Sequence, residues 1–422
     1  MNDKKKQDKL ECSFCGKSRE LVTSLIAGEK SFICNECIDL CVQVLAGEED
    51  PREHSFDNAT TPSQIKEYLD RFIVSQDSAK IALSVAVRNH YKRVHQKKKN
   101  IIKKSNVLLI GPTGSGKTLL AQKLAENLNV PFAVADATTL TESGYVGDDV
   151  ENVIHRLLQN ANYDIRLAER GIIYIDEIDK KGRKSEGSSI TRDVSGEGVQ
   201  QALLKLIEGS EIRVPPQGGR KHPGKETILI NTKDILFILG GAFIGLEESV
   251  NKRIQGNGST MGFGAKLQNK EKSTDDWLRN VEPEDFVKYG MIPEFIGRIP
   301  VITALKSLDV NDLVRILSEP EDSIIKEFIE IFDMDHVELE FTKEAQYWIA
   351  QEAVNKKTGA RGLRNIIEDL LREVQFTLPE QALDGLTKVI VQAPRDGNDK
   401  LVLLYRQSPK RKNSNATKQQ ES

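Results

Sequence analysis

The stretch Gly111–Thr118, which reads Gly-Pro-Thr-Gly-Ser-Gly-Lys-Thr, has residue types and a spacing that could bind phosphate. It fits the pattern G-x-x-x-x-G-K-[ST], in which backbone N–H groups and the start of a helix cradle nucleotide phosphates. In this pattern Lys117 reaches the β- and γ-phosphates, and the Thr118 hydroxyl holds Mg²⁺. A chance glycine turn is the alternative, but a full match is rare at the ordinary abundance of glycine. The residues expected to contact the nucleotide are Gly111, Pro112, Thr113, Gly114, Ser115, Gly116, Lys117, Thr118 and Leu119.

A pair of carboxylates follows another apolar run. Ile172–Ile175 is apolar throughout, as in a parallel strand covered on both faces, and leads directly into Asp176 and Glu177. Open α/β sheets bind their ligands at the carboxyl ends of such strands. Asp176 can complete a Mg²⁺ shell, and Glu177 can orient and deprotonate an attacking water. Together with the phosphate loop, this pair predicts hydrolysis of a nucleoside triphosphate.

The five cysteines all lie in the first 41 residues. Cys12 and Cys15 form one C-x-x-C pair, and eighteen residues later Cys34 and Cys37 form another, which is the spacing of four-cysteine zinc sites. A disulfide or a redox pair is the alternative, but two tight knuckles in a chain without a secretion signal favour zinc. The set leaves no position for a catalytic water, so we expect a structural site whose metal stabilises a module too small for its own core. Cys41 is expected to be a packing residue.

The elements that must position these residues alternate between strand and helix patterns. A helix is expected to start with Thr61 as its cap and Pro62 in its first turn, and a second helix to follow Gln76. The remaining expected elements of this region are strands over Asn106–Ile110, Phe132–Ala135, Ile172–Ile175 and Ile235–Leu239 and a helix over Val150–Leu158. We therefore expect an α/β fold built on a parallel sheet.

Beyond residue 306 the pattern changes to long amphipathic helices, with short strands expected at Val337–Phe341 and Lys388–Val391. The tail from Ser408 is rich in Lys, Asn, Gln and Ser, which is typical of disorder. The expected organisation is a zinc module at 1–46, a linker at 47–62, a large ATPase domain at 63–305, a small α+β domain at 306–407 and a disordered tail at 408–422.

The composition excludes several classes of protein. The chain has 422 residues with 60 Lys and Arg against 63 Asp and Glu, so its formal net charge is −3 and no global field favours nucleic acid or a membrane surface. It contains no run of eighteen apolar residues, and its first residues lack the apolar segment of a secretion signal. We therefore expect a cytoplasmic protein.

The order of these motifs resembles that of the Clp family of AAA+ protein unfoldases. The zinc module, the phosphate loop, Ile172–Glu177 and the run Gly359–Arg364 occur in the family's order, and the resemblance extends from Cys12 to about residue 400. It implies an AAA+ P-loop NTPase large domain, a smaller α+β C-terminal domain, and ATP, Mg²⁺ and Zn²⁺ as cofactors. It also implies an ATP-dependent unfoldase and chaperone that threads protein substrates into a ClpP-type peptidase and has no peptidase activity of its own.

The resemblance assigns further residues around the nucleotide. Arg298, in Pro293–Arg298, matches the family's arginine finger, and Arg361 matches its second sensor arginine. A finger that enters a neighbouring subunit's site implies a ring, which in this family is a homohexamer. Ile73 and Val74 resemble the family's adenine-contacting segment. Without the family, surface ion pairs and ordinary core residues are the alternatives for these positions.

The resemblance also implies a central pore that grips substrate. Tyr145 and Val146, flanked by glycines, match the loop that lines the pore, where a bulky side chain can grip any polypeptide without reading its sequence. A basic loop matches the pore entrance, where positive charge would favour an acidic tag or a C-terminal carboxylate. A tyrosine in a turn and a solvated charge run are the alternatives. The basic residues are Arg220, Lys221 and His222, and Ser185–Ser195 lies where the family has a second pore loop.

Two positions depart from the family pattern. Met261, Gly262 and Phe263 match the peptidase-docking tripeptide, which usually begins with Ile, Leu or Val, and methionine is a flexible substitute that can fill an apolar pocket. Many AAA+ relatives end the first-sensor strand in a polar residue, whereas Gly240 and Gly241 follow Leu239 here, so no first sensor is assigned.

Two other functions are alternatives to an unfoldase. A zinc-containing AAA+ ATPase that remodels nucleic-acid complexes is the main alternative, although the balanced charge and the lack of an aromatic and basic patch count against it. The related protease-linked unfoldase HslU is a further one. The zinc module and the lack of a long inserted domain speak against it.

Overall fold

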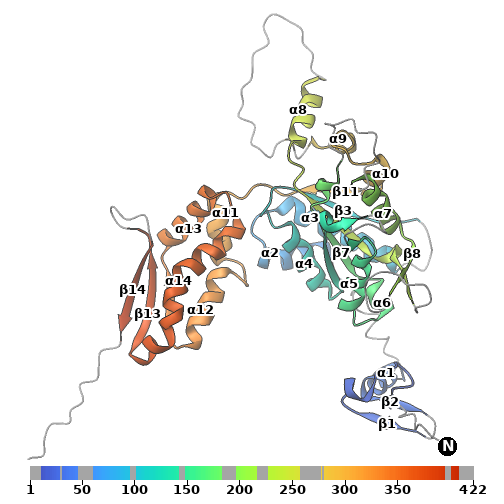
Figure 1. The fold of residues 1–422 in the computed structure, drawn as a ribbon, viewed down its shortest axis with the longest axis horizontal. Coiled ribbons are helices and arrows are strands. Elements are labelled where there is room, and N and C mark those ends of the chain that lie inside the picture. The colour runs from blue at the N-terminus through green and yellow to red at the C-terminus, as the bar shows by residue number, and fades with distance from the viewer. Residues whose placement is uncertain are drawn as a thin grey trace, which may run out of the picture. The chain divides into compact units, whose positions relative to one another are not determined.

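The computed structural model describes residues 11–28, 31–45, 60–95, 101–141, 148–182, 196–215, 227–256, 277, 280–394 and 401–407. The chain divides into two compact units, residues 1–60 and 61–422, and each is described by itself. The elements are drawn in Figure 1. The sequence predictions for residues 142–147, 183–195, 216–226, 257–276 and 408–422 concern positions outside the described residues.

The first unit is a small module built around the four cysteines. The short helix η1 (Arg19–Leu21) precedes the hairpin of β1 (Leu25–Ala27) and β2 (Phe32–Cys34), and α1 (Asn35–Leu45) follows directly. Among its described residues, the buried hydrophobic cluster consists of Cys12, Cys34 and Cys37, with a few half-buried aliphatic side chains around it. Such a cluster is too small to hold a fold by burial alone.

The second unit contains a five-stranded sheet with the order β11-β3-β10-β7-β4, in which every neighbouring pair is parallel. Parallel pairing brings the carboxyl ends of all five strands to one edge. The strands are β3 (Val107–Ile110), β4 (Phe132–Asp136), β7 (Ile172–Asp176), β10 (Leu236–Gly241) and β11 (Val301–Ala304). The parallel sheet predicted from the sequence is confirmed.

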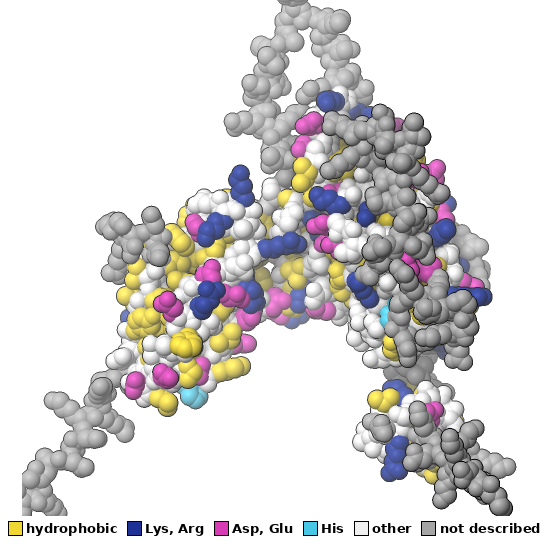
Figure 2. Space-filling model, in the orientation of Figure 1, with side chains coloured by type: hydrophobic (Ala, Val, Ile, Leu, Met, Phe, Trp, Pro, Cys, Tyr) yellow, Lys and Arg dark blue, Asp and Glu magenta, His cyan; other side chains and the backbone are white. Residues whose placement is uncertain are grey.

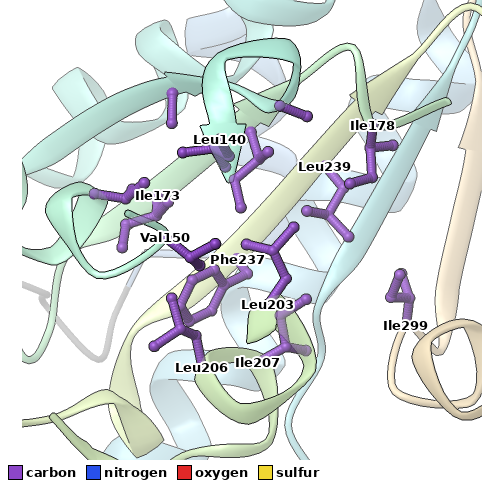
Figure 3. Close-up of a cluster of buried hydrophobic side chains, with 14 of the residues drawn as sticks. Leu140, Val150, Ile173, Ile178, Leu203, Leu206, Ile207, Phe237, Leu239 and Ile299 are labelled. Atoms are coloured by element: carbon purple, nitrogen blue, oxygen red, sulfur yellow. The ribbon is translucent and has the colours of Figure 1, made fainter. Parts of the chain in front are cut away.

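Helices cover both faces of this sheet. Side chains of β7 and β10 pack with the helix α7 (Glu197–Glu208), as Figure 3 shows for Ile173, Phe237 and Leu203. The alternate residues of the same strands point to the other face, where α3 (Asp77–Val94) and α4 (Lys117–Leu128) contact the sheet. Other elements are α5 (Asn152–Asn160), α6 (Ile165–Ala168), α8 (Leu246–Gly256), α9 (Pro283–Tyr289), α10 (Pro293–Gly297), η2 (Ala137–Thr139), η3 (Ile178–Lys181), η4 (Thr232–Asp234) and the strand pairs β5 (Leu140–Thr141) with β6 (Asp148–Asp149) and β8 (Glu211–Val214) with β9 (Ile228–Asn231).

The helix start predicted at Thr61 is confirmed. Thr61 caps α2 (Pro62–Phe72), its side chain accepts a hydrogen bond from the Gln64 backbone N–H, and the Gln64 side chain accepts one from the Thr61 backbone N–H. This capping box satisfies two backbone donors of the first turn. The helix therefore begins at Pro62, a residue that the linker expected at 47–62 includes.

The described residues of 310–407 form a smaller lobe with a hydrophobic core of its own, whereas those of 61–304 form the larger lobe. The strand expected at Lys388 is confirmed and pairs on both sides, whereas the third strand of this sheet was not predicted. Its elements are α11 (Val310–Ser318), α12 (Ile324–Met334), α13 (Lys343–Asn355), α14 (Ala360–Leu383), β12 (Glu338–Phe341), β13 (Leu386–Gln392) and β14 (Val402–Gln407).

Several polar contacts join the two lobes. Arg71 holds Glu321 through two hydrogen bonds of 2.5 and 2.7 Å, and the Lys123 ammonium lies 2.9 Å from the Asp322 carboxylate. On the face drawn in Figure 2, basic and acidic side chains are intermixed, and hydrophobic side chains are also exposed. No helix among the described residues is both long enough and apolar enough to span a bilayer.

Replacing Gly240 with alanine should destabilise the larger lobe, because the added Cβ would lie 2.1 Å from the hydroxyl oxygen of Tyr174. Such overpacking costs about 1–3 kcal/mol in free energy of unfolding, which urea denaturation measures. In the control Gly297→Ala, the Cβ would meet no described atom within 4 Å, so the change should stay within about 0.5 kcal/mol. Adding Tyr174→Phe to Gly240→Ala should recover part of the loss, and an unaltered Gly240→Ala would contradict the packing described.

Candidate nucleotide site and metal centre

The phosphate loop runs from the end of β3 to the start of α4, as predicted. Gly114 and Gly116 have φ angles of 82° and 95°, in the left-handed region that glycine adopts without a Cβ clash. Gly111 is required for a different reason, because a Cβ there would lie 2.7 Å from the Leu305 carbonyl oxygen. The loop can therefore turn its backbone N–H groups inward only with these glycines in place.

Lys117 is the first residue of α4 and is buried at 8% exposure. Its ammonium donates hydrogen bonds to the Gly111 and Pro112 carbonyl oxygens, at 2.7 and 2.9 Å. Burial lowers the pKa of Lys117, the Asp176 and Asp179 carboxylates oppose this shift, and the Arg361 charge adds to it. A phosphate in the loop would supply the counter-charge that this buried ammonium lacks.

Asp176 ends β7 and is the centre of a hydrogen-bond cluster. Its carboxylate accepts bonds from the Thr118 hydroxyl at 3.0 Å, from the Tyr174 hydroxyl at 3.1 Å and from the Glu177 backbone N–H at 2.9 Å. Adjacent oxygen ligands of an octahedral Mg²⁺ lie about 2.9 Å apart. The spacing of the Thr118 and Asp176 oxygens therefore fits neighbouring ligands of one Mg²⁺.

Glu177 has a φ of 55°, which is unusual for a residue with a Cβ. This conformation ends the strand at Asp176 and begins η3 one residue later. Both Asp176 and Glu177 line the same pocket as the phosphate loop. Strained backbone of this kind is concentrated at functional sites, which supports the role predicted for Glu177.

Tyr174 and Gly240 were not singled out as site residues from the sequence alone. The Tyr174 side chain is fully buried, and its hydroxyl occupies the space that a side chain on Gly240 would take. Burial raises the pKa of Tyr174, so the phenol stays protonated and donates to Asp176. The glycine that follows Leu239 thus makes room for a residue that orients the Asp176 carboxylate.

Asp179 is a further acidic residue of the pocket, and it was not predicted from the sequence. It is 4% exposed, and one carboxylate oxygen accepts a hydrogen bond from the Ala242 N–H at 3.2 Å, which ties η3 to the end of β10. Its other oxygen has no hydrogen-bond partner among the described residues. The signal available in the sequence was the third acid in the run Asp-Glu-Ile-Asp.

Arg361 comes to the pocket from the smaller lobe, as the resemblance implied. It lies in the first turn of α14, and the start of that helix is close to the phosphate loop, because a Cβ on Gly114 would lie 3.7 Å from the Ala360 nitrogen. The pocket has a volume of about 340 Å³. Its lining includes Thr113, Gly114, Gly116, Lys117, Thr118, Leu119, Asp176, Glu177, Asp179 and Arg361.

Other predicted residues lie apart from this pocket. Arg298 is absent from its lining, and the Arg298 guanidinium pairs instead with Glu208 at 2.7 Å, with both side chains exposed. Ile73 and Val74 are buried and line a separate cavity of about 430 Å³ together with residues of the smaller lobe. Tyr145, Val146, Arg220, Lys221, His222, Met261, Gly262 and Phe263 lie outside the described residues.

The four cysteines of the first unit come together as the spacing predicted. All four sulfurs lie within 4.8 Å of one another, and no disulfide joins them. The Cys12–Cys37 and Cys15–Cys34 sulfur distances are 3.8 and 3.7 Å, which matches the edge of about 3.8 Å expected for tetrahedral Zn²⁺ with thiolate ligands. Burial opposes ionisation of Cys12, but backbone N–H groups outweigh it and lower the pKa of that thiol to about 6. The donor set therefore fits zinc.

Comparisons with known proteins match this arrangement. Residues 10–47 match the ClpX C4-type zinc finger, residues 102–302 match the AAA domain of the Cdc48 subfamily, and residues 308–389 match the C-terminal, D2-small domain of ClpB protein. The matches agree with a zinc site in the first unit and a nucleotide site at the phosphate loop.

Two curated relatives carry the name ATP-dependent Clp protease ATP-binding subunit ClpX, one from Borrelia duttonii (strain Ly) and one from Borrelia recurrentis (strain A1). Each is 54% identical over 394 residues, which cover 92% of this chain and 91% of the relative. Since the zinc module, the ATPase lobe and the smaller lobe are all present in one chain, it belongs to the ClpX family of AAA+ ATPases.

Proposed function

We propose that this chain is an ATP-dependent protein unfoldase that recognises protein substrates and threads them into a ClpP-type peptidase, and that it also acts as a chaperone. The observation that carries this is the pocket in which the phosphate loop, Asp176, Glu177 and Arg361 meet, in a chain similar over most of its length to Clp protease subunits. The test is loss of fluorescence from a tagged folded reporter in the presence of Mg²⁺ and ATP, with and without the peptidase.

In the proposed reaction each residue of the pocket has a separate task. Lys117 and the backbone N–H groups of the loop bind the phosphates, and Thr118 and Asp176 would hold Mg²⁺, which neutralises phosphate charge when bound. Glu177 orients the attacking water and accepts its proton. Arg361 contributes positive charge from the smaller lobe, so that residues of both lobes would interact with the γ-phosphate.

The position of Arg298 supports the proposal that the chain assembles into a ring. Its guanidinium lies outside its own chain's nucleotide pocket and is exposed, so it is available to a neighbouring site. The smaller lobe also exposes Phe376 and Leu383 of α14 almost completely, which leaves apolar surface that another chain could cover. Both observations support a homohexamer in which each arginine finger completes the next subunit's site.

Traction on the substrate is assigned to the pore residues. Tyr145 and Val146 would grip the polypeptide, and Arg220, Lys221 and His222 would attract acidic or C-terminal tags at the entrance. Met261, Gly262 and Phe263 would dock on the peptidase. We also propose that the zinc module, which exposes Phe14 and Leu21, recruits substrates or adaptors or dimerises.

The domain division at 46, 62, 305 and 407 and the cytoplasmic location belong to the same proposal. Reduced cysteines that serve as zinc ligands are compatible with a reducing compartment. The similarity to ClpX relatives over 92% of the chain supports the same order of domains.

Glu177→Gln should abolish steady-state hydrolysis while ATP still binds, because the amide keeps the shape of the side chain but cannot accept the proton of water. Phosphate release measures turnover, and a fluorescent ATP analogue measures affinity. We expect a loss of at least about 100-fold in turnover and affinity within about threefold of the unaltered chain. Normal turnover in this variant would remove Glu177 from the proposed role.

Tyr145→Ala should hydrolyse ATP and fail to unfold a stably folded reporter, because alanine offers little surface to grip. The time needed to unfold a substrate by force depends on its unfolding rate. The loss of unfolding activity should therefore be smaller with a destabilised reporter. Tyr145→Phe is the matched control and should retain unfolding. Undiminished unfolding by Tyr145→Ala would refute the grip.

Phe263→Ala should uncouple the chain from its peptidase while unfolding continues, because the aromatic anchor of the docking tripeptide is lost. Peptide release from the reporter measures the coupled activity, and loss of reporter fluorescence measures unfolding alone. Met261→Ile, which restores the usual residue of the family, is the control and should dock at least as well. Peptide release by Phe263→Ala at the unaltered rate would count against docking.

A further inference from the structure

The turn between α2 and α3 contains two successive residues in the left-handed region. Ser75 and Gln76 have φ angles of 59° and 62°, although both carry a Cβ. Such a turn is unfavourable without compensating contacts. Gln76 is 4% exposed, so its amide must find partners inside the protein.

The Gln76 amide bridges two segments that are distant in the sequence. Its Nε2 donates to the Ser115 carbonyl at 3.3 Å and to the Lys306 carbonyl at 2.9 Å, and its Oε1 accepts from the Lys306 N–H at 2.9 Å. Ser115 belongs to the phosphate loop, and Lys306 belongs to the connector at residues 305–309 between the lobes. One side chain therefore holds the phosphate loop and the connector together.

The contact with Ser115 bears directly on phosphate binding. In a trans peptide the C=O of Ser115 and the N–H of Gly116 point in opposite directions within one plane. A donor that fixes the Ser115 oxygen thus turns the Gly116 N–H away from itself, and Gly116 lines the nucleotide pocket. If phosphate binding shifted this peptide, the hydrogen bond to Gln76 would change, and with it the bonds between Gln76 and Lys306.

Ser75 makes the corresponding contact with the smaller lobe. Its hydroxyl donates to the Asp312 carboxylate at 2.5 Å, and the Lys306 ammonium lies 2.9 Å from the same carboxylate. Asp312 is 5% exposed and takes part in the capping box that begins α11. The turn thus contacts the phosphate loop, the connector and the first helix of the smaller lobe.

We propose that Gln76 is a positioning residue that couples phosphate binding at Gly116 to the connector 305–309, and that Ser75 transmits the coupling to α11. The inference rests on the proposed ATPase function and deepens it. It assigns transmission between the nucleotide pocket and the smaller lobe to the Ser75-Gln76 turn, in addition to the role proposed for Arg361, which lines the pocket from the smaller lobe.

The first experiment measures hydrogen exchange of the hexameric protein with and without Mg²⁺ and a slowly hydrolysed ATP analogue. In the unaltered chain, the analogue should change exchange in peptides covering both the phosphate loop and residues 305–312. Gln76→Glu keeps the acceptor for the Lys306 N–H but removes the Nε2 donor to the Ser115 and Lys306 carbonyl oxygens, so the change at 305–312 should disappear while protection of the loop remains. The control Gln159→Glu makes the same chemical change on the exposed surface of α5 and should behave as the unaltered chain.

The second experiment separates binding from coupling by steady-state kinetics with the reporter. Gln76→Glu should raise KM for ATP by about tenfold, because the buried hydrogen bond to the Ser115 carbonyl of the phosphate loop is lost, and should lower the number of reporters unfolded per ATP. Ser75→Ala leaves the Ser115 contact in place, so it should lower reporters unfolded per ATP with KM within about twofold. If Gln76 had only a structural role, the rates of ATP hydrolysis and of reporter unfolding would fall together, in proportion to the amount of folded hexamer. Thermal unfolding and size-exclusion chromatography measure that amount.

Two results would overturn the proposal. One is a nucleotide-dependent change at 305–312 that persists in Gln76→Glu. The other is a Ser75→Ala variant in which KM for ATP rises by the same factor as the number of reporters unfolded per ATP falls. If Gln76→Glu does not fold, Ser75→Ala decides it by the same two measurements. Failure of the unaltered chain to unfold the reporter would refute the proposed function instead, whereas the exchange experiment needs only nucleotide binding.

Discussion

The parallel pairing of β3, β7 and β10 is the constraint on which the nucleotide pocket depends. It brings the phosphate loop, the Asp176-Glu177 pair and the glycines after Leu239 to one edge of the sheet, although they come from distant parts of the chain. Apolar side chains on both faces keep the strands in register, and a slip of one residue between β7 and β10 would move Gly240 away from the Tyr174 hydroxyl. The geometry of the pocket is therefore a consequence of how the sheet is packed.

The zinc module is stabilised in a different way. Its described residues bury little apart from the cysteines themselves, so the interactions that an extended core supplies in the larger unit must come from metal bonds. The module's exposed Phe14 and Leu21 are then free to contact partners, because folding does not require their burial. Stability and recognition thus use different side chains in this part of the chain.

The sequence alone predicted the features whose chemistry lies in neighbouring residues. The phosphate loop, the Asp176-Glu177 pair and the two C-x-x-C knuckles are short patterns, and strand and helix periodicities around them correctly gave a parallel sheet. Contacts that depend on register or tertiary packing could not be predicted in this way. Tyr174 meets Gly240 only because of how two strands pair, and Gln76 meets Ser115 and Lys306 only in the folded chain. The last strand, β14, was missed although it begins with four apolar residues and is longer than β3.

The two lobes have separate hydrophobic cores, and the described contacts between them include the exposed ion pair of Arg71 with Glu321 and the pair of the half-buried Lys123 with the exposed Asp322. Mobile ions screen exposed charges over roughly 10 Å at 0.1 M ionic strength, whereas they weaken apolar packing far less. A higher salt concentration should therefore weaken the ion pairs between the lobes and leave the hydrophobic core of each lobe intact. The strength of the contacts between the lobes thus depends on the ionic strength of the solution.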